Sequence, residues 1–336
     1  MSLIVDALLI AAVGVAAWAA TALALKFLDR RSILDRPNER SSHRRPTPRG
    51  GGIAIVPIIV AAWSAIGIAT HAPLLHWVVL ALGAGLALVS WIDDVRDLHP
   101  GPRFLSHIAA VTVVLILLPG DLLVFQGWLP PMLDRMAAGL AWVWFINLYN
   151  FMDGIDGITG VETMSIGGGL AVIAALGGGM TAAGVPITAL GLSLAATSAG
   201  FLIWNWHPAR IFMGDVGSVP TGFLSGWLLI ATAASGAWAV AMILPAYYLA
   251  DATITLARRA RRLEPIWRAH REHFYQQAVS GGHGHNRVAI AVGILNLALI
   301  GAAALSAYRP LLAVGLASVA TAATLFRFSR MGPTSL

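Results

Sequence analysis

The sequence predicts an all-α polytopic membrane protein with about eleven transmembrane helices. Its 336 residues are 57% hydrophobic and only 11% charged, and the mean hydropathy is +0.75. Such a chain has too little polar surface for a soluble domain. Its apolar residues also fall in runs long enough to cross the roughly 30 Å hydrocarbon core of a bilayer as helices. We therefore expect one membrane domain over residues 1–336, without linkers or internal repeats.

Eleven apolar runs give the expected helices in chain order. The first run is followed by Lys26, Arg30 and Arg31, whereas a signal peptide carries its positive charges before the apolar run, so we interpret it as a retained helix. The sixth run is the least regular, because glycine triplets flank a short apolar stretch. The expected spans are residues 3–26, 53–70, 74–92, 104–119, 136–151, 163–178, 185–204, 217–233, 237–256, 288–306 and 310–327.

The distribution of basic residues predicts the orientation in the membrane. With the N-terminus outside, 20 of the 22 lysines and arginines fall on the cytosolic side, and only Arg135 and Arg309 fall outside. The formal charge of +6 then reflects topology and anionic lipid, so nucleic acid is not an expected partner. A chain without cysteine has no disulfides and no thiolate metal sites. The expected cytosolic segments are residues 28–52, 93–103, 152–162, 205–216 and 257–287.

Three acidic motifs lie in these cytosolic segments, and the first closes the third expected helix. Asp97 follows Asp93 by four residues, which places both on one helical face beside Asp94. Adjacent carboxylates repel each other, so the pattern suits a general base or a Mg²⁺ site. A plain polar helix end, paired with Arg96 or Arg103, is the alternative.

The second motif places two amides and two carboxylates at the end of an apolar run. Asn147, Asn150 and Asp153 recur every three residues, so helical spacing would place them along one side, facing a shared cavity. Asp156 follows in the same stretch. Ionisable groups at a membrane boundary are costly, which favours a functional site. A helix cap, the structural alternative, would need only one such residue.

The third motif joins a membrane exit to a re-entry, between Asn205 and Ser218. Asp215 stands close to two glycines, where it is sterically open and well placed to bind a metal. Phe212 could stack on a nucleobase, although an aromatic residue at an interface more often anchors its helix. We expect Ser218 to cap the next helix. Three acidic motifs on different segments indicate one metal-assisted site that folding brings together.

Two basic loops complete the pattern. In the first, Arg44, Arg45 and Arg49 offer phosphate donors, although positive-inside charge alone would also place them there. Its prolines and glycines are incompatible with a regular helix, so we expect an ordered loop.

The second loop is rich in histidine. His270 and His273 are three residues apart and could meet on one helical face. Carboxylate-rich surroundings favour a hard cation with phosphate ligands over zinc, so we expect these two histidines to contact a pyrophosphate. For His283 and His285, a solvated loop and a functional role are equally open.

Taken in order, these motifs resemble those of the polyprenyl-phosphate N-acetylhexosamine-1-phosphate transferases over nearly the whole chain. The resemblance implies a bundle of ten or eleven transmembrane helices with a cytosolic-facing cleft, in a bacterial inner (plasma) membrane. The matching motifs are His43–Gly52, Asp93-Asp94-x-x-Asp97-Leu98 with Arg103, Asn147-x-x-Asn150-x-x-Asp153-Gly-Ile-Asp156-Gly, Phe212-Met-Gly-Asp-x-Gly-Ser218 and a His-containing loop.

The resemblance also implies roles for individual residues. Asp93, Asp94 and Asp215 would be catalytic, with Mg²⁺, or Mn²⁺ as an alternative, on Asp215 and Asp94. The implied nucleotide-binding residues are Asn150, Asp153, Asp156, Asn205 and Phe212. The implied phosphate-binding residues are Arg44, Arg45, Arg49, Arg103, His270 and His273.

The implied partners are undecaprenyl phosphate, a UDP-N-acetylhexosamine and a second copy of the chain in a homodimer. The lipid phosphate would attack the β-phosphorus of the donor and release UMP, which requires charge neutralisation by Mg²⁺ and basic side chains. Glu272 interrupts the tight run of histidines that the family usually carries at this position. This departure favours the members that initiate O-antigen or other surface polysaccharides over the peptidoglycan lipid I-type phospho-MurNAc-pentapeptide transferase.

Two other classes share some of these features. A solute transporter or lipid flippase also carries membrane carboxylates, but commonly at the bilayer midplane and with internal repeats. A CDP-alcohol phosphotransferase would need an Asp-Gly-x-x-Ala-Arg signature, which the sequence lacks. The donor sugar, the identity of any catalytic base and the polysaccharide pathway stay open at this point.

Overall fold

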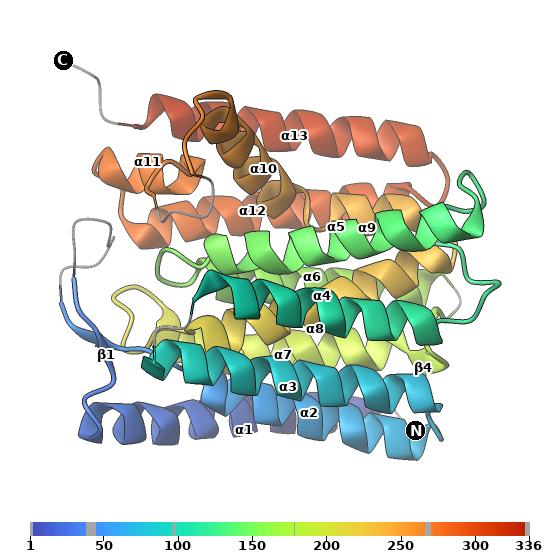
Figure 1. Cartoon of the computed structure of the whole chain (residues 1–336), viewed down its shortest axis with the longest axis horizontal. Coiled ribbons are helices and arrows are strands. Elements are labelled where there is room, and N and C mark those ends of the chain that lie inside the picture. The colour runs from blue at the N-terminus through green and yellow to red at the C-terminus, as the bar shows by residue number, and fades with distance from the viewer. Residues whose placement is uncertain (1–2, 38–44, 97–98, 178, 266–269, 333–336) are drawn as a thin grey trace.

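A computed structural model describes residues 3–37, 45–96, 99–177, 179–265 and 270–332 of the chain. It confirms the all-α polytopic architecture that the sequence predicts (Figure 1). The helices are α1 (Leu3–Arg30), α2 (Gly52–Ala69), α3 (Leu74–Arg96), α4 (Pro100–Leu117), α5 (Pro131–Phe151), α6 (Ile158–Leu176), α7 (Ile187–Asn205), α8 (Asp215–Ala234), α9 (Trp238–Ile243), α10 (Ala246–Arg261), α11 (Phe274–Ser280), α12 (His285–Leu305) and α13 (Pro310–Arg330). Two short antiparallel hairpins pair β1 (Leu34–Asp35) with β2 (Thr47–Pro48), and β3 (Thr181–Ala182) with β4 (Val185–Pro186).

The chain is a multi-pass membrane protein. Within the described residues, nine helices are long and apolar enough to cross a membrane, namely α1 to α4, α6 to α8, α12 and α13. Helix α5 and the α9–α10 pair occupy the other two expected positions and are not among these nine. The continuous helix expected over residues 237–256 is interrupted, because α9 ends at Ile243 and α10 begins at Ala246. Pro245 at this break has no backbone N–H to donate to a continuing helix.

Helix α8 is the most deeply enclosed of the nine, because its residues 215–233 are all buried, and it lies in the middle of the bundle (Figure 1). Trp142 of α5 stacks on two rings of α8, with centroid distances of 4.9 Å to Phe223 and 6.0 Å to Trp227. The Trp142 Nε1–H also donates to the backbone carbonyl of Phe223 at 3.0 Å. Stacked aromatic rings have a preferred geometry, so this contact fixes α8 against α5.

The polar segments gather at one end of the bundle, at the left in Figure 1. There α3 and α5 end, α8 and α12 begin, and α11 and the β1–β2 hairpin lie alongside (Figure 1). Helices α1 to α8 run in alternating directions (Figure 1), which brings motifs far apart in the sequence to the same end. The three acidic motifs and both basic loops are therefore neighbours in space.

Candidate active site

Two arginines bridge three carboxylates at this end of the bundle. Arg49 Nη2 lies 2.9 Å from Asp94 Oδ1 and 2.8 Å from Asp215 Oδ1. Arg103 Nη1 lies 2.7 Å from Asp93 Oδ2, and its Nη2 lies 2.5 Å from Asp215 Oδ2. Asp215 is therefore the common partner, linked to each member of the aspartate pair through a different arginine. We refer to these five residues as the acidic–arginine cluster.

The backbone around Gly214 brings Asp215 into the cluster. Gly214 has φ +70°, a conformation that favours glycine, and a Cβ added there would lie 2.8 Å from Asp94 Oδ2. Asp94 accepts the backbone N–H groups of Val216 at 3.0 Å and of Asp215 at 3.4 Å. These are N–H groups of the first turn of α8, which have no partner within the helix. Asp94 of the first acidic motif thus caps α8, and α8 begins with Asp215, the metal-binding candidate of the third motif.

The β1–β2 hairpin positions Arg49. The Arg49 N–H donates to the Ile33 carbonyl at 3.2 Å, and the Phe212 N–H donates to the Pro48 carbonyl at 2.8 Å. Arg49 and Phe212 also form a parallel backbone bridge. These bonds join the first basic loop to the third acidic motif, so the Arg49 guanidinium is held beside Asp215.

The cluster carries more negative than positive charge. Three carboxylates face two guanidinium groups, which leaves one negative charge unbalanced when all are ionised. Burial disfavours the charge of Arg49, but Asp215 and Asp94 outweigh it and raise the pKa of Arg49 above its usual value. The carboxylates supply only oxygen ligands, which hard divalent cations such as Mg²⁺ prefer. The donor chemistry and the excess negative charge therefore fit a divalent cation.

The second motif follows the expected helical spacing only in part. Asn147 and Asn150 lie on α5, but α5 ends at Phe151, so the expectation of a shared helical face is wrong for Asp153. Asn150 Nδ2 donates to Ser218 Oγ at 2.8 Å, which ties the end of α5 to the start of α8. Ser218 lies within the first turn of α8, which begins at Asp215, and it is not the cap that the sequence suggested.

Asp153 is coupled electrostatically to the acidic–arginine cluster. Burial raises the pKa of Asp153 to about 6, and the charges of Asp215 and Asp94 act in the same direction. A hydrogen bond with Thr159 and the charge of Arg49 oppose this shift. Asp153 is thus a fourth acidic group whose ionisation depends on the charge of the cluster.

Asp156 lies in a separate group with two histidines. His207 Nδ1 lies 2.6 Å from Asp156 Oδ2, which also accepts the Ala209 N–H at 3.1 Å. His285 Nδ1 lies 3.2 Å from Asp156 Oδ1. Burial alone would raise the pKa of Asp156, but the hydrogen bonds and charges of His285 and His207 outweigh it and lower this pKa. We call Asp156, His207 and His285 the Asp–His cluster.

Asn205 makes two hydrogen bonds to the backbone, one of them to the loop that carries Asp156. Its Oδ1 accepts the Gly157 N–H at 3.0 Å, and its Nδ2 donates to the Ile211 carbonyl at 2.9 Å. Both polar groups of this predicted nucleotide-binding residue therefore have protein partners. Phe212, another predicted nucleotide-binding residue, is half-buried beside Arg49.

His270 and His273 come together, as the sequence predicts, but without a shared helix. Helix α11 begins at Phe274, and the two imidazole rings stack with centroids 4.8 Å apart. Burial lowers the pKa of His270 to about 4, and the charges of His273 and Arg259 add to this shift. Glu272, the residue that interrupts the histidine run, accepts hydrogen bonds from Arg259 and Arg262.

Asp251 is a buried organising residue that the sequence analysis missed. Its carboxylate lies 3.0 Å from His273 Nδ1 and accepts the backbone N–H groups of Phe274 at 3.1 Å and Tyr275 at 3.2 Å. The Tyr247 hydroxyl donates to the same carboxylate at 3.1 Å. Asp251 therefore caps α11 and orients His273. An aspartate inside an apolar run expected to span the membrane was the available signal.

Arg44 and Asp97 fall outside the described residues. Arg45 is exposed.

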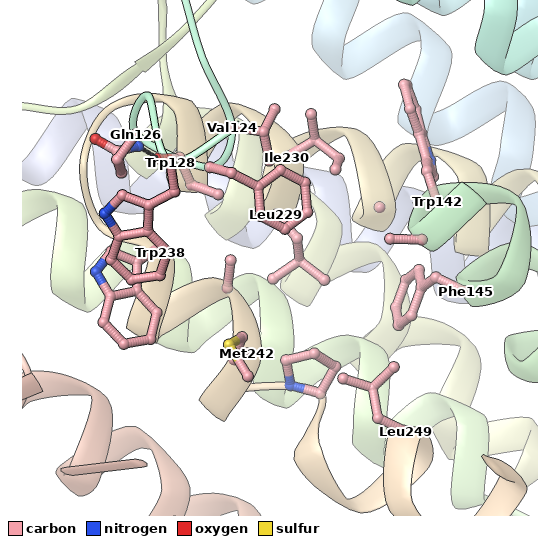
Figure 2. Close-up of a pocket in the computed structure, with 16 residues that line it drawn as sticks. Val124, Gln126, Trp128, Trp142, Phe145, Leu229, Ile230, Trp238, Met242 and Leu249 are labelled. Carbon is pink, nitrogen blue, oxygen red and sulfur yellow. Dashed lines mark hydrogen bonds between the residues drawn. The ribbon is translucent and has the colours of Figure 1, made fainter. Parts of the chain in front are cut away.

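An apolar pocket of about 540 Å³ adjoins the helices that carry the polar groups. Figure 2 shows Trp128 and Trp238 side by side at one end and Trp142 with Phe145 at the other. Phe145 precedes Asn150 by five residues on α5, so one helix lines the pocket and reaches the polar end of the bundle. The pocket residues are Val124, Phe125, Gln126, Trp128, Ala141, Trp142, Phe145, Gly226, Leu229, Ile230, Ala233, Trp238, Ala241, Met242, Pro245 and Leu249.

Residues 76–233 match the glycosyl transferase family 4 model, and this segment contains all three acidic motifs. The chain is 29% identical over 274 residues to a probable undecaprenyl-phosphate N-acetylglucosaminyl 1-phosphate transferase of Bacillus subtilis, with 78% of this chain and 74% of the relative covered. It is 27% identical over 343 residues to a decaprenyl-phosphate N-acetylglucosaminephosphotransferase of Mycobacterium tuberculosis, with 88% and 82% covered. A phospho-N-acetylmuramoyl-pentapeptide-transferase of Moorella thermoacetica is 30% identical over 207 residues, with 55% and 61% covered.

Proposed function

Because the chain belongs to the polyprenyl-phosphate hexosamine-1-phosphate transferases, we propose that it transfers an N-acetylhexosamine 1-phosphate from a UDP-sugar to undecaprenyl phosphate. The general reaction follows from membership, since the relatives are named as transferases that act on a polyprenyl phosphate. The UDP donor and the undecaprenyl acceptor are part of the proposal. The observation that carries the proposed transfer between two anionic substrates is the meeting of Asp215 with Arg49, Arg103 and the Asp93–Asp94 pair.

In the proposed reaction, an oxygen of the lipid phosphate forms a bond to the β-phosphorus of the UDP-sugar. The bond between the β-phosphorus and the oxygen that it shares with the α-phosphorus breaks, and UMP leaves with the bonding electrons. Both reactants are anions, so positioning and charge neutralisation should supply much of the rate. A phosphate monoester is already ionised near neutral pH, so the reaction needs no obligatory general base.

The acidic–arginine cluster can provide this neutralisation. Mg²⁺ held by Asp215 and Asp94 would neutralise charge on the donor pyrophosphate and act as a Lewis acid. The Arg49 and Arg103 side chains are 39% and 28% exposed, against 13% for Asp215, so the guanidinium groups lie nearer to solvent and to an incoming phosphate. Each guanidinium presents several N–H donors in a fork that suits phosphate oxygens. Asp93 would keep the Arg103 guanidinium oriented while it binds a phosphate.

We assign the polyprenyl chain to the apolar pocket beside α5 and α10. The pocket is lined almost entirely by carbon (Figure 2). Helix α5 lines it at Trp142 and Phe145 and continues to Asn150. A lipid tail in the pocket would place its phosphate toward the polar end of the bundle. The positive-inside distribution supports a cytosolic location for that end, where a UDP-sugar is available.

We further propose that the product initiates O-antigen or another surface polysaccharide. The two N-acetylglucosamine 1-phosphate transferases of Bacillus subtilis and Mycobacterium tuberculosis are covered over 74% and 82% of their length. The pentapeptide transferase is covered over 61% of its length. Glu272 also distinguishes this chain, because its pairing with Arg259 and Arg262 adds a carboxylate where a phosphate-binding loop would otherwise be more basic.

A donor panel tests the proposal directly. Purified protein in detergent would receive undecaprenyl phosphate, Mg²⁺ and one of several UDP-N-acetylhexosamines or UDP-MurNAc-pentapeptide, with UMP release as the readout. We expect release with an N-acetylhexosamine donor, loss of release with EDTA and loss in Asp215→Ala. Asp121→Ala, at an exposed position, is the matched control. Release only with UDP-MurNAc-pentapeptide would assign the peptidoglycan reaction, and no release with any donor would reject the proposal.

A further inference from the structure

The Asp–His cluster joins three segments that are far apart in the sequence. Asp156 lies in the loop between α5 and α6, His207 follows α7, and His285 is the first residue of α12. The two imidazole rings have centroids 4.9 Å apart. The ligand atoms of the three residues all lie within 4.8 Å of one another. Within the part of the chain that the structure describes, this is the one group of three His, Cys, Asp or Glu residues so close together.

The donor set differs in kind from that of the acidic–arginine cluster. Two imidazole nitrogens and one carboxylate oxygen suit a borderline transition metal, whereas carboxylates alone suit Mg²⁺. Metal–ligand bonds of about 2.0–2.2 Å place two ligands of one ion up to about 4 Å apart, so a small closure brings all three within bonding distance. We propose that Asp156, His207 and His285 form a binding site for a transition-metal ion of the Zn²⁺ type.

The environment of the cluster supports a cation. Asp156 and His285 are buried, while the His207 side chain is 39% exposed and leaves a route from solvent. Burial disfavours the charge of the Asp156 carboxylate, and the two histidines together with the Ala209 N–H outweigh this effect and lower its pKa. With neutral imidazoles the group carries one negative charge. A metal ion would displace the proton that His207 Nδ1 shares with Asp156.

The site also has the outer hydrogen bonds that fix metal ligands. The Ala209 N–H holds Asp156 Oδ2 at 3.1 Å. The Asp156 N–H donates to His285 Nδ1 at 3.2 Å, and a metal ion on that nitrogen would replace this hydrogen bond. The Asn205–Gly157 bond fixes the next residue of the same loop. Such partners orient ligands and contribute to affinity. A bound ion would pin the loop before α6, the segment after α7 and the start of α12 to one another.

Metal titration tests this site without reference to the transfer reaction. Tag-free protein would be treated with chelator, returned to millimolar Mg²⁺ to fill oxygen-only sites, and titrated with Zn²⁺ by calorimetry and with Co²⁺ by visible absorption. We expect one ion per chain in the wild type. His207→Ala and His285→Ala should each weaken binding by more than about tenfold. Equal affinity in these variants, or no binding in the wild type, would overturn the proposal.

Two neighbouring histidines provide matched controls. His283 lies two residues before His285, and His270 belongs to the stacked histidine pair. His283→Ala and His270→Ala should bind Zn²⁺ as the wild type does, and loss of binding in His270→Ala with retention in His207→Ala would reassign the site. Zn²⁺ should raise the thermal unfolding midpoint of the wild type and of His283→Ala but not of His207→Ala. Because His207 is exposed, its variant should fold even where His285→Ala does not.

Discussion

Asp94 caps α8 through the backbone N–H of Val216, which donates to Asp94 Oδ2 at 3.0 Å. The same carboxylate pairs with Arg49 at 2.9 Å. One side chain therefore stabilises the start of the central helix and balances charge in the acidic–arginine cluster. These two roles can be separated, because a cap needs an acceptor oxygen and charge balance needs a carboxylate.

The first prediction separates these roles with two substitutions at Asp94. Asn keeps an acceptor oxygen, so Asp94→Asn should unfold close to the wild-type midpoint, whereas Asp94→Ala should lose about 1 kcal/mol or more with the cap. Both variants should lose UMP release, because neither has the carboxylate. Thermal unfolding and the transfer assay measure the two effects on the same preparations. Wild-type turnover in Asp94→Asn would exclude a role for the charge.

The second prediction concerns the bridge that Arg103 makes between Asp93 and Asp215. The bridge uses two different guanidinium nitrogens, and a lysine ammonium cannot reproduce that fork. Arg103→Lys and Arg103→Ala should both reduce the transfer rate, by at least about tenfold, one factor of ten corresponding to about 1.4 kcal/mol in the barrier. Arg309→Ala removes an exposed arginine elsewhere and should leave the rate unchanged. Full activity in Arg103→Lys would show that a single positive charge at this position is enough for transfer.

The third prediction follows from the pKa of Asp153, which burial raises to about 6. This value lies above the unfolded pKa of about 3.9, so the stabilising contribution is fully present below about pH 4 and is lost as the pH rises through about 6. Asp153→Asn stays neutral, so it should unfold at a higher temperature than the wild type at pH 8 and at a similar one at pH 4. The gain in unfolding free energy at pH 8 has an upper limit of roughly 3 kcal/mol, which corresponds to the difference between a pKa of about 6 and one of about 3.9.

A control separates this effect from a general response to pH. Asp121 is exposed, so Asp121→Asn should change the unfolding midpoint little at either pH. If Asp153→Asn is less stable than the wild type at pH 8, the Asp153 carboxylate is stabilised by its partners instead of penalised by burial.

The sequence predicted the elements that depend on local pattern and missed those that depend on long-range contact. Long apolar runs place helices through length and hydropathy alone, and the acidic motifs at their ends were recognisable from composition. Pro245 could have predicted the break between α9 and α10, because proline removes a helix N–H. The pairing of Asp156 with His285 joins residues 129 positions apart, and no periodicity encodes it. Asp153 also left the expected helical face because α5 ends two residues earlier.

The fourth prediction concerns Asp251, the buried cap of α11. Asp251→Ala would leave the Phe274 and Tyr275 N–H groups without their acceptor, at about 1–3 kcal/mol for each buried group. Tyr275 also donates to the Phe151 carbonyl at 3.2 Å, so displacement of α11 should disturb the loop that carries Asp153. We expect a lower unfolding midpoint together with reduced transfer.

Asp251→Asn gives the corresponding control. It retains one acceptor oxygen, so it should recover part of the stability lost in Asp251→Ala. A variant that unfolds like the wild type but transfers slowly would show that His273 orientation, and not the cap, is the main role of Asp251.

The fifth prediction tests whether the apolar pocket holds the lipid acceptor. Met242 lines the pocket, and Met242→Trp should fill part of its volume of about 540 Å³ (Figure 2). Because the pocket contains almost no polar surface, the substitution should raise KM for undecaprenyl phosphate several-fold while leaving KM for the UDP-sugar unchanged. Ile203→Trp adds the same side chain at an exposed apolar position on α7, outside the pocket, and should change neither constant. If Met242→Trp raises both constants equally, the pocket supports the fold and the polyprenyl chain binds elsewhere. If the chain does occupy the pocket, a polyprenyl phosphate too short to reach Met242 should bind the variant and the wild type alike.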